Sequence, residues 1–440
     1  MSHYKPYSAY CESGVEWIGE VPDGWEVKPI CRVASCNDDA LSENTPADAV
    51  LRYVDISAVN HTDGITQATE VRFADAPSRA RRQAKSGDVV VSTVRTYLKA
   101  VAAVTEDYAG CIYSTGFAVL RAQRAQVDPA FLKWMVLNDL LIQAIVAHSE
   151  GLSYPAINVT ELVKLKSVVP PLTEQCAIAA FLDRETARIN ALIAKKTRFI
   201  ELLKEKRSAL ITHAVTKGLD PNVKMRDSGV EWIGEVPDGW EVKPICRVAS
   251  CNDDALSENT PADAVLRYVD ISAVNHTDGI TQATEVRFAD APSRARRQAK
   301  SGDVVVSTVR TYLKAVAAVT EDYAGCIYST GFAVLRARSA QVDPAFLKWM
   351  ALNDLLIQAI EAHSEGLSYP AINATELVKL KTVVPPLTEQ STIATFLDRE
   401  TTRIDILIAK VQSSIDLLKE RRSAFISAAV TGRIDLRGGS

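Results

Sequence analysis

Pro170-Pro171-Leu172-Thr173-Glu174-Gln175 opens the stretch of sequence that decides the fold. The proline pair ends the preceding element, because proline lacks a backbone N–H and biases its neighbour away from the helical region. Thr173 then suits the N-cap of a helix, and Glu174 suits the positive end of the helix dipole. Gly218 is a suitable C-terminal stop. A helix between them would be roughly 65 Å long, which exceeds an ordinary globular helix.

An apolar stripe runs along this predicted helix. Its residues recur at seven-residue intervals on three neighbouring lattices, which hold Leu182, Ile189, Leu203 and Leu210, then Leu192 and Phe199, then Ile193 and Ile200. Lys196 and Arg207 interrupt the stripe, so it is not a pure zipper. The same pattern starts again at Pro385 and runs to Gly432, so we expect two long helices that pair with each other.

The composition is typical of a globular protein, with 440 residues, 47% hydrophobic and 24% charged. We find neither an apolar run of membrane-spanning length nor a signal peptide, since residues 1–12 are polar and aromatic. These features predict a cytoplasmic protein without membrane contact. A net charge of −4 argues against a wholly basic nucleic-acid binder, but it leaves room for a local basic patch.

An internal duplication organises the whole chain. Residues 13–122 and 228–337 are identical at a constant offset of 215, and six differences follow before Gln175 and Gln390. Three of these six are Gln123 and Arg124, which correspond to Arg338 and Ser339, and Val146, which corresponds to Glu361. We expect none of the three to touch the candidate binding residues named below. Beyond Gln175 the sequences of the two predicted helices diverge. The module is therefore nearly identical in the two copies, whereas the helix that follows it is not.

Each copy reads as a mixed α/β module. Pro22-Asp23-Gly24 is a turn within a loop that carries two tryptophans. Strands are predicted over 51–56, 88–94, 101–104 and 116–120, and an amphipathic helix over 129–148. The predicted order is therefore module, helix, module, helix.

Several motifs, in this order, resemble the specificity subunit of type I restriction–modification systems. They are Trp17-Ile18-Gly19-Glu20-Val21-Pro22-Asp23-Gly24-Trp25, Ser114-Thr115-Gly116-Phe117, Val169-Pro170-Pro171-Leu172-Thr173-Glu174-Gln175, Phe181-Leu182-Asp183, the segment 202–211 and Ala214-Val215-Thr216-Lys217-Gly218. Each motif alone is weak, but their order and spacing are specific, and the resemblance covers the chain twice.

The resemblance implies two target-recognition domains separated by a coiled-coil strut of two long antiparallel helices, related by a pseudo-two-fold axis. The expected boundaries are 1–170 and 222–385 for the two domains, 171–221 for the central helix and 386–440 for the distal helix. It also implies double-stranded DNA, two methyltransferase subunits and restriction (translocase) subunits as partners. With these partners, Lys196 and Arg207 are expected to contact the methyltransferase subunits or the DNA between the half-sites. Those subunits, rather than this chain, would bind S-adenosylmethionine, ATP and Mg²⁺ and would methylate adenine N6.

This chain departs from the family pattern in one respect, because its two recognition domains are nearly identical. Family members normally carry two different ones. Two identical readers related by a two-fold axis would see identical half-sites on opposite strands. The predicted target is therefore an interrupted palindrome.

No catalytic residue and no metal site are predicted within the chain. Asp128-Pro129-Ala130-Phe131 lacks the second proline of an amino-methyltransferase loop and looks like a helix start. His61 and His148 are expected at surface or helix-capping positions. The eight cysteines lack the spacing of a zinc site and are expected to be buried reduced thiols.

Two basic clusters and one loop are the candidate DNA-binding residues in each copy. The first cluster suits phosphate contact, the second leaves a valine-rich strand for a loop and suits base reading, and the loop follows Gly151. A solvated basic face for the first cluster, and packing of module against helix for the loop, remain open alternatives. The candidates are Arg79, Arg81, Arg82, Lys85, Arg95, Thr96, Tyr97, Lys99, Ser153 and Tyr154, repeated as Arg294, Arg296, Arg297, Lys300, Arg310, Thr311, Tyr312, Lys314, Ser368 and Tyr369.

A second class of function also fits the sequence. Duplication, long helices and an acidic pI suit a symmetric adaptor that holds partner proteins on a coiled-coil strut without DNA. Salt-dependent, sequence-specific DNA binding discriminates the two hypotheses. A self-contained methyltransferase or nuclease lacks its motifs.

Overall fold

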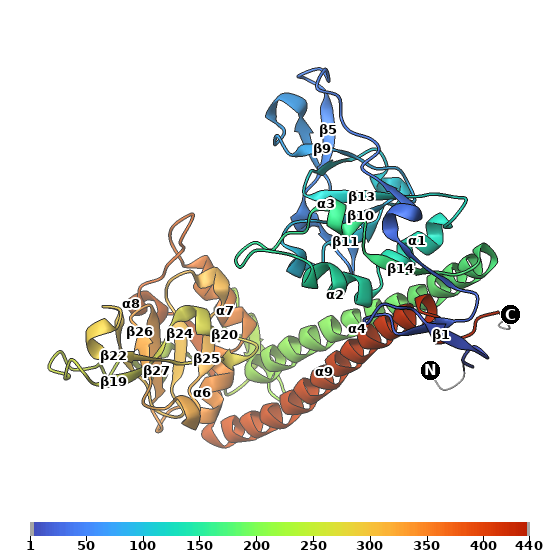
Figure 1. The fold of residues 1–440 in the computed structure, drawn as a ribbon. Helices are drawn as coiled ribbons and strands as arrows, with labels where there is room; N and C mark the ends of the chain where they lie inside the picture. Colours follow the sequence, from blue (N-terminus) through green and yellow to red (C-terminus); the bar gives the residue numbers. More distant parts are fainter. Residues whose placement is uncertain (1–3, 438–440) are drawn as a thin grey trace. The chain divides into compact units, whose positions relative to one another are not determined.

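The computed structural model describes residues 4–437, which divide into two compact units (Figure 1). One unit contains the residues up to Lys196 together with those from Ser413 onward, and the other contains Thr197–Gln412. Each unit therefore holds one module, part of the helix that follows it and part of the helix that follows the other module. The mixed α/β class with a pair of long helices is as predicted.

The two long helices are α4 (Leu172–Lys217) and α9 (Leu387–Val430). The prediction of Thr173 as N-cap is wrong, because α4 begins at Leu172 and the amides of Glu174 and Gln175 donate to the carbonyl of Pro171. Pro171 lacks a backbone N–H, so it can directly precede the first helical residue without leaving a donor unpaired. Gly218 adopts a φ of 76°, the left-handed conformation that ends a helix.

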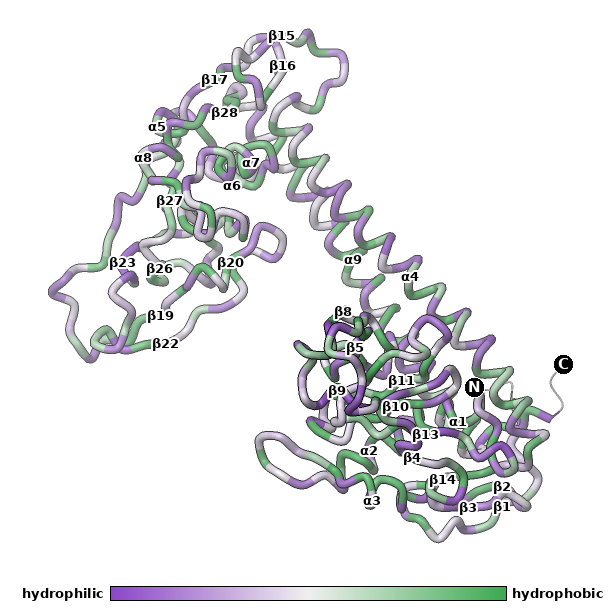
Figure 2. Tube along the Cα trace, turned by 90° about the horizontal axis from the view of Figure 1, so that it is seen from above, coloured by the Kyte–Doolittle hydropathy of each residue, from purple (hydrophilic) through white to green (hydrophobic). Residues whose placement is uncertain are grey.

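Pairing between α4 and α9 is antiparallel within each unit. In the first unit, Phe181 packs edge-on against Phe425 at 6.1 Å between ring centroids. In the second unit, Arg207 Nε donates to Asp405 Oδ1 at 3.1 Å. The expectation that Arg207 contacts a partner or DNA is therefore corrected: its side chain is 14% exposed and is used within the helix pair. Hydrophilic and hydrophobic residues alternate along both helices (Figure 2).

Two four-stranded sheets form the centre of the first module. Their strand orders are β11-β10-β13-β4 and β8-β5-β12-β9, and all neighbours are antiparallel except β5 and β12. The strands of the first sheet are β4 (Ala34–Cys36), β10 (Val89–Ser92), β11 (Val101–Ala103) and β13 (Phe117–Ala122). Those of the second are β5 (Val50–Val54), β8 (Thr69–Arg72), β9 (Ala80–Gln83) and β12 (Ile112–Ser114). The four predicted strands are all present.

Smaller elements complete this module. Three two-stranded sheets are formed by β1 (Tyr10–Glu12) with β2 (Glu20–Pro22), β3 (Glu26–Pro29) with β14 (Lys166–Val169), and β6 (Val59–Asn60) with β7 (Gly64–Ile65). The short 3-10 helices are η1 (Ile30–Arg32), η2 (Ile56–Ala58), η3 (Phe73–Asp75), η4 (Thr96–Leu98) and η5 (Glu106–Tyr108).

The predicted single helix over 129–148 is wrong, because it is split in two. The pieces are α1 (Pro129–Val136) and α2 (Asp139–Ala147), bent by 57°, and α3 (Val159–Leu162) follows. Asn138 causes the break: its side chain caps α2 by accepting from the Leu140 amide. In the described part of the chain no single helix is long and apolar enough to cross a membrane; only the bent pair of α1 and α2 has the length and composition.

The second module repeats these elements. Its four-stranded sheets contain β18 (Ala249–Cys251), β27 (Phe332–Ala337), β24 (Val304–Ser307) and β25 (Val316–Ala318), and β22 (Thr284–Arg287), β19 (Val265–Val269), β26 (Ile327–Ser329) and β23 (Ala295–Gln298). Its pairs are β15 (Met225–Asp227) with β16 (Glu235–Pro237), β17 (Glu241–Pro244) with β28 (Lys381–Val384), and β20 (Val274–Asn275) with β21 (Gly279–Ile280). Its helices are α5 (Ile245–Val248), α6 (Pro344–Ala351), α7 (Asp354–Ala362), α8 (Ala374–Leu377), η6 (Ile271–Ala273), η7 (Phe288–Asp290), η8 (Thr311–Leu313) and η9 (Glu321–Tyr323).

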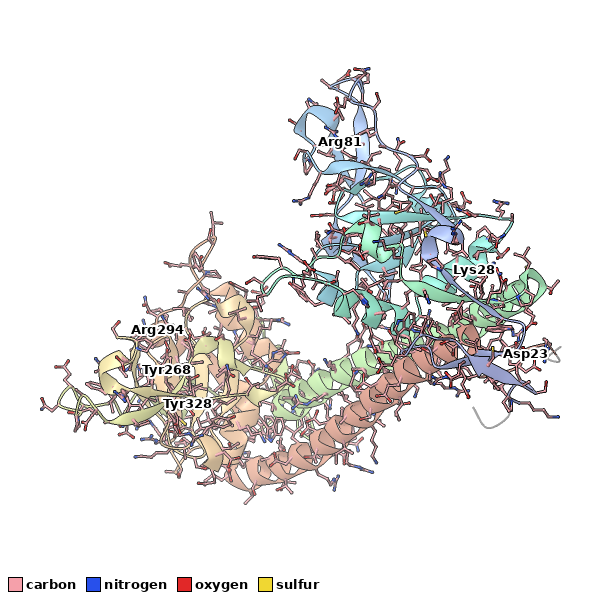
Figure 3. All side chains as sticks on the ribbon, viewed as in Figure 1. Asp23, Lys28, Arg81, Tyr268, Arg294 and Tyr328 are labelled. Carbon is pink, nitrogen blue, oxygen red and sulfur yellow. The ribbon has the colours of Figure 1, made fainter. Side chains whose placement is uncertain are left out.

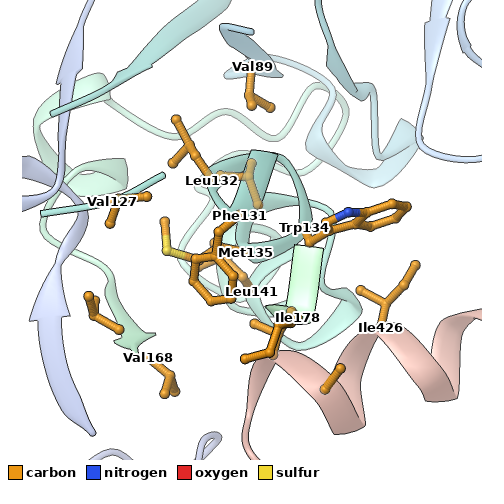
Figure 4. Packing of buried hydrophobic residues seen from close by; sticks show 14 of the residues in the cluster. Val89, Val127, Phe131, Leu132, Trp134, Met135, Leu141, Val168, Ile178 and Ile426 are labelled. Carbon is orange, nitrogen blue, oxygen red and sulfur yellow. The ribbon is translucent and has the colours of Figure 1, made fainter. Parts of the chain in front are cut away.

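A continuous apolar core joins each module to the long helices. In the first unit Phe131 and Met135 of α1 are fully buried and pack with Leu141 of α2 and Ile178 of α4, while Ile426 of α9 lies beside them (Figure 4). Burying each such side chain contributes about 1.5–3 kcal/mol relative to leaving it exposed. This core holds the module rigidly against its helices.

Polar contacts fasten each module to the helix that follows the other one. Asn138 Oδ1 accepts from the Ser427 hydroxyl of α9 at 2.8 Å. In the second unit Asn353 Oδ1 accepts from the Thr212 hydroxyl of α4 at 3.0 Å. Asn138 and Asn353 are buried, so these hydrogen bonds satisfy groups that would otherwise be costly to bury.

Candidate nucleic-acid interface

The loop after β10 holds a strained backbone in both modules. Arg95 and Lys99 flank η4 with φ values of 49° and 50°, and Arg310 and Lys314 repeat these values. A non-glycine residue in this left-handed region costs roughly 1–2 kcal/mol. Such strain is maintained only where surrounding contacts fix the backbone, and it concentrates at functional sites.

Thr96 supplies those contacts. Its hydroxyl donates to Ser149 Oγ at 2.8 Å, and its amide donates to the Pro155 carbonyl at 3.3 Å. The side chain is only 3% exposed. The structure therefore places Thr96, and Thr311 equally, under the loop rather than on its surface, so Thr96 positions its neighbours Arg95 and Tyr97.

A hairpin lies beside this loop. Glu150 and Ala156 exchange two backbone hydrogen bonds of 2.9 Å, and Gly151 allows the turn with a φ of 106°. Leu152 is fully exposed at the tip, and Tyr154 is 67% exposed. The Arg95 guanidinium lies over the Tyr154 ring at 5.2 Å, a cation–π contact that links hairpin and loop.

Together these side chains form one exposed surface, which we call the loop–hairpin surface. It combines cations, aromatic rings and apolar tips, a mixture that suits phosphates, base edges and thymine methyl groups. Sequence reasoning did not select Leu98 from the second cluster and missed Leu152, for which an apolar residue directly after the Gly151 turn was the available signal. The surface consists of Arg95, Tyr97, Leu98, Lys99, Leu152, Ser153 and Tyr154.

A cavity of about 480 Å³ adjoins this surface and brings Arg79 and Arg95 together. Ser57, Ser114 and Thr115 supply hydroxyl groups to its lining. Arg79 is held by Asp55, with Nη2 and Oδ2 2.9 Å apart, and its Nε donates to the Tyr53 hydroxyl at 3.1 Å. Two guanidinium groups and several hydroxyls provide donors for an anionic oxygen.

Two further members of the first basic cluster, Arg81 and Lys85, make contacts within the module. Arg81 lies over the Phe73 ring at 5.3 Å, and Lys85 Nζ is 3.0 Å from Asp39 Oδ2. Hydrogen bonds from Lys85, and then from Arg121, lower the pKa of Asp39. Arg82 is partly buried. Figure 3 labels Arg81, and in the second module it labels Arg294, whose Nε donates to the Tyr268 hydroxyl at 3.1 Å.

The second module reproduces the loop–hairpin surface almost completely. Arg310 lies over Tyr369 at 5.3 Å, and Thr311 donates to Ser364 at 2.9 Å. Its remaining members are Tyr312, Leu313, Lys314, Leu367 and Ser368. One contact is new: Lys314 Nζ lies 3.9 Å from Glu361 Oε2. The expectation that no difference between the copies touches a candidate reading residue is therefore wrong.

The histidines and cysteines lie partly where predicted. His148 Nδ1 is 2.8 Å from the Ala144 carbonyl, which is a helix-capping position as expected. His61 is instead half-buried, and burial lowers its pKa. The prediction of buried thiols holds only for Cys111 and Cys326, since Cys36 and Cys251 are partly exposed and the other four cysteines, Cys11, Cys31, Cys176 and Cys246, are exposed. All eight are free, and within residues 4–437 no cluster of His, Cys, Asp and Glu is arranged to hold a metal.

Comparison with known proteins gives relatives over most of the chain. No family model matches. The chain is 22% identical over 433 residues to the putative type I restriction enzyme MjaX specificity subunit of Methanocaldococcus jannaschii, covering 96% of each. It is also 22% identical over 329 residues to the type I restriction enzyme EcoDI specificity subunit of Escherichia coli, covering 70% of each.

Solved structures share the fold. A chain from a study of complex assembly and conformational transition in a type I restriction–modification system matches with a TM-score of 0.72 and 23% identity, covering 94% of this chain and 99% of that one. The HsdS subunit of Thermoanaerobacter tengcongensis matches with a TM-score of 0.51 and 23% identity, covering 94% and 98%. The chain is therefore similar over most of its length to proteins named as type I restriction enzyme specificity subunits, and it shares the fold of solved subunits from such systems.

Proposed function

We propose that this chain is the DNA-recognition subunit of a type I restriction–modification complex, in which each module binds one half of a bipartite site. The observation that carries the proposal is the loop–hairpin surface, which both modules present on the same strained backbone. Strain, exposed apolar tips and cations on one rigid support are the features of a reading surface.

The near-identity of the two modules determines the form of the target. Arg95, Tyr97, Leu152 and Tyr154 all recur at equivalent positions, so the side chains that face DNA are the same in both modules. Identical readers select identical half-sites, and a two-fold relation would place them on opposite strands. The proposed target is an interrupted palindrome.

The chain would do no chemistry itself. In this proposal methyltransferase subunits dock on the long helices and supply the S-adenosylmethionine site, and restriction subunits supply ATP and Mg²⁺ chemistry. Methylation would fall on adenine N6 within the recognised site, in the cytoplasm where such DNA is present.

Mapping methylated adenines in cells that express this chain with its methyltransferase subunits tests the proposal. We expect one interrupted palindrome, and methylation at it should disappear when the gene for this chain is removed. Two unrelated half-sites would contradict the palindrome, because identical surfaces cannot read different bases. Methylation that persists without this chain would contradict the recognition role itself.

Salt dependence separates this proposal from the protein adaptor. The assembled complex should bind a duplex carrying the mapped site more tightly than a scrambled duplex. Its affinity should fall as salt rises, with a logarithmic slope of about −0.9 for each phosphate neutralised. An adaptor without DNA function would show neither sequence preference nor this slope.

A further inference from the structure

The two loop–hairpin surfaces differ in charge at one position. Val146 near the end of α2 corresponds to Glu361 near the end of α7. The carboxylate of Glu361 lies 3.9 Å from the Lys314 ammonium, and both side chains are partly exposed, at 30% and 38%. Lys314 is a member of the second surface.

The first surface has no such contact. Within residues 4–437 no carboxylate forms an ion pair with Lys99, and the side chain at the equivalent helical position is Val146. The loop geometry is otherwise the same, because Lys99 and Lys314 share a φ of 50°. The module copies therefore differ here in electrostatics and not in backbone shape.

The fold explains why a helix residue reaches the loop. Ser149 and Ser364, just after α2 and α7, accept the hydroxyl hydrogen bonds of Thr96 and Thr311. These hydrogen bonds bring the last helical turn against the loop. A residue at position 146 or 361 therefore lies beside the lysine that ends the loop.

We propose that Glu361 attenuates DNA binding by the second module, so that the two modules read the same bases with unequal affinity. The inference rests on the proposed function. A phosphate must compete with the Glu361 carboxylate for the Lys314 ammonium, and the carboxylate also repels the phosphate at a distance shorter than the Debye length of about 8 Å in physiological salt. Lys99 of the first module has no such competitor, so the first module binds its half-site with the higher affinity.

Reciprocal substitutions in the full chain, assembled with its methyltransferase subunits, test the proposal. The probe is a duplex carrying the mapped palindrome. Glu361→Val should raise affinity, and Val146→Glu should lower it, each by up to about five-fold, which is the range of a partly exposed ion pair. Glu361→Gln keeps the shape without the charge and should behave as Glu361→Val does. Unchanged affinity in all three variants would overturn the proposal.

The two lysines provide an internal comparison. Lys99→Ala should cost more affinity than Lys314→Ala, because Lys314 is already engaged by Glu361. In the Glu361→Val background the two substitutions should cost the same. Equal costs in the parent chain would overturn the attenuation.

Half-scrambled probes separate failure of this inference from failure of the proposed function. On a duplex with one intact half-site, the stronger module should occupy that half, so Arg95→Ala should cost more than Arg310→Ala, and Glu361→Val should make the two costs equal. If the parent complex prefers the intact site but the two costs are equal, only the attenuation is overturned. If the parent complex does not distinguish intact from scrambled DNA, the proposed function and the inference both fail.

Discussion

The loop–hairpin surface and the basic run from Arg79 to Lys85 differ in what their charges touch. Both are dense in cations in the sequence. In the structure two cations of the run form ion pairs within the module: Arg79 pairs with Asp55 and Lys85 with Asp39. In the residues that the structure describes, Arg95 forms no ion pair and rests on an exposed aromatic ring. Charge density along a sequence is therefore a poor measure of the charge available to DNA.

The first and largest effect is expected from Arg95→Ala combined with Arg310→Ala. Each arginine that makes a bidentate base contact contributes about 1–3 kcal/mol of discrimination. Losing both should lower affinity for the mapped site by about 100-fold or more, while binding to scrambled DNA changes little. Fluorescence anisotropy on the two duplexes measures the difference.

Arg32→Ala with Arg247→Ala is the matched control, because it removes the same net charge from exposed positions outside the loop–hairpin surface. Its preference for the mapped site should stay at the parent value. If the control loses as much as the Arg95 and Arg310 variant, then overall charge and not this surface carries recognition.

The long helices and most strands were predictable from the sequence because their signals are local. The stripe from Leu182 to Leu210 and the bounding prolines defined α4, and the valines of 89–91 defined β10. The bend at Asn138 was missed, because apolar residues continue on both sides of it and only the side-chain cap reveals the break.

The composition of the site was less predictable, because it depends on contacts between distant residues. Thr96 looked like a reading residue, yet Ser149, 53 residues away, buries its hydroxyl. Arg207 looked free, yet Asp405 is 198 residues away in the sequence and binds it. Glu361 was expected not to touch a candidate residue, and only the fold brings it to Lys314.

The second effect concerns the ring beneath the arginine. Tyr154→Ala with Tyr369→Ala removes the cation–π contact that orients Arg95 and Arg310, and an exposed contact of this kind is worth about 0.5–1 kcal/mol. With two modules affected, affinity for the mapped site should fall by about five- to thirtyfold. Tyr154→Phe with Tyr369→Phe keeps the rings and should retain nearly parental affinity. Equal losses in both variants would mean that the hydroxyls, rather than the rings, are used.

The third effect separates positioning from contact. Thr96→Val with Thr311→Val preserves shape but removes the buried hydrogen bond to Ser149 and Ser364, which is worth about 1 kcal/mol in each module. The melting temperature should fall by about 2–4 °C and affinity by less than in the tyrosine variant. Calorimetry and binding measured together test this.

Ser149→Ala with Ser364→Ala removes the same hydrogen bonds from the other side. It also removes the hydrogen bonds that these hydroxyls donate to the Ile145 and Ile360 carbonyls. Combined with the threonine variant, the total destabilisation should be less than the sum of the two, because both variants delete the threonine–serine hydrogen bond. Full additivity would show that the two hydroxyls do not depend on each other.

The smallest effect is expected from Lys85→Ala with Lys300→Ala, since these lysines are already paired with Asp39 and Asp254. Affinity for DNA at neutral pH should change by less than about two-fold.

The substitution removes the largest cause of the lowered pKa of each aspartate. Because that pKa is lower in the folded than in the unfolded state, the ion pair stabilises the fold above the unfolded pKa and is lost as pH falls through the folded one. The variant should therefore begin acid unfolding at a slightly higher pH than the parent chain. A loss of DNA affinity as large as that of the Arg95 and Arg310 variant would instead mean that DNA displaces these internal ion pairs, and the contrast between the two clusters would disappear.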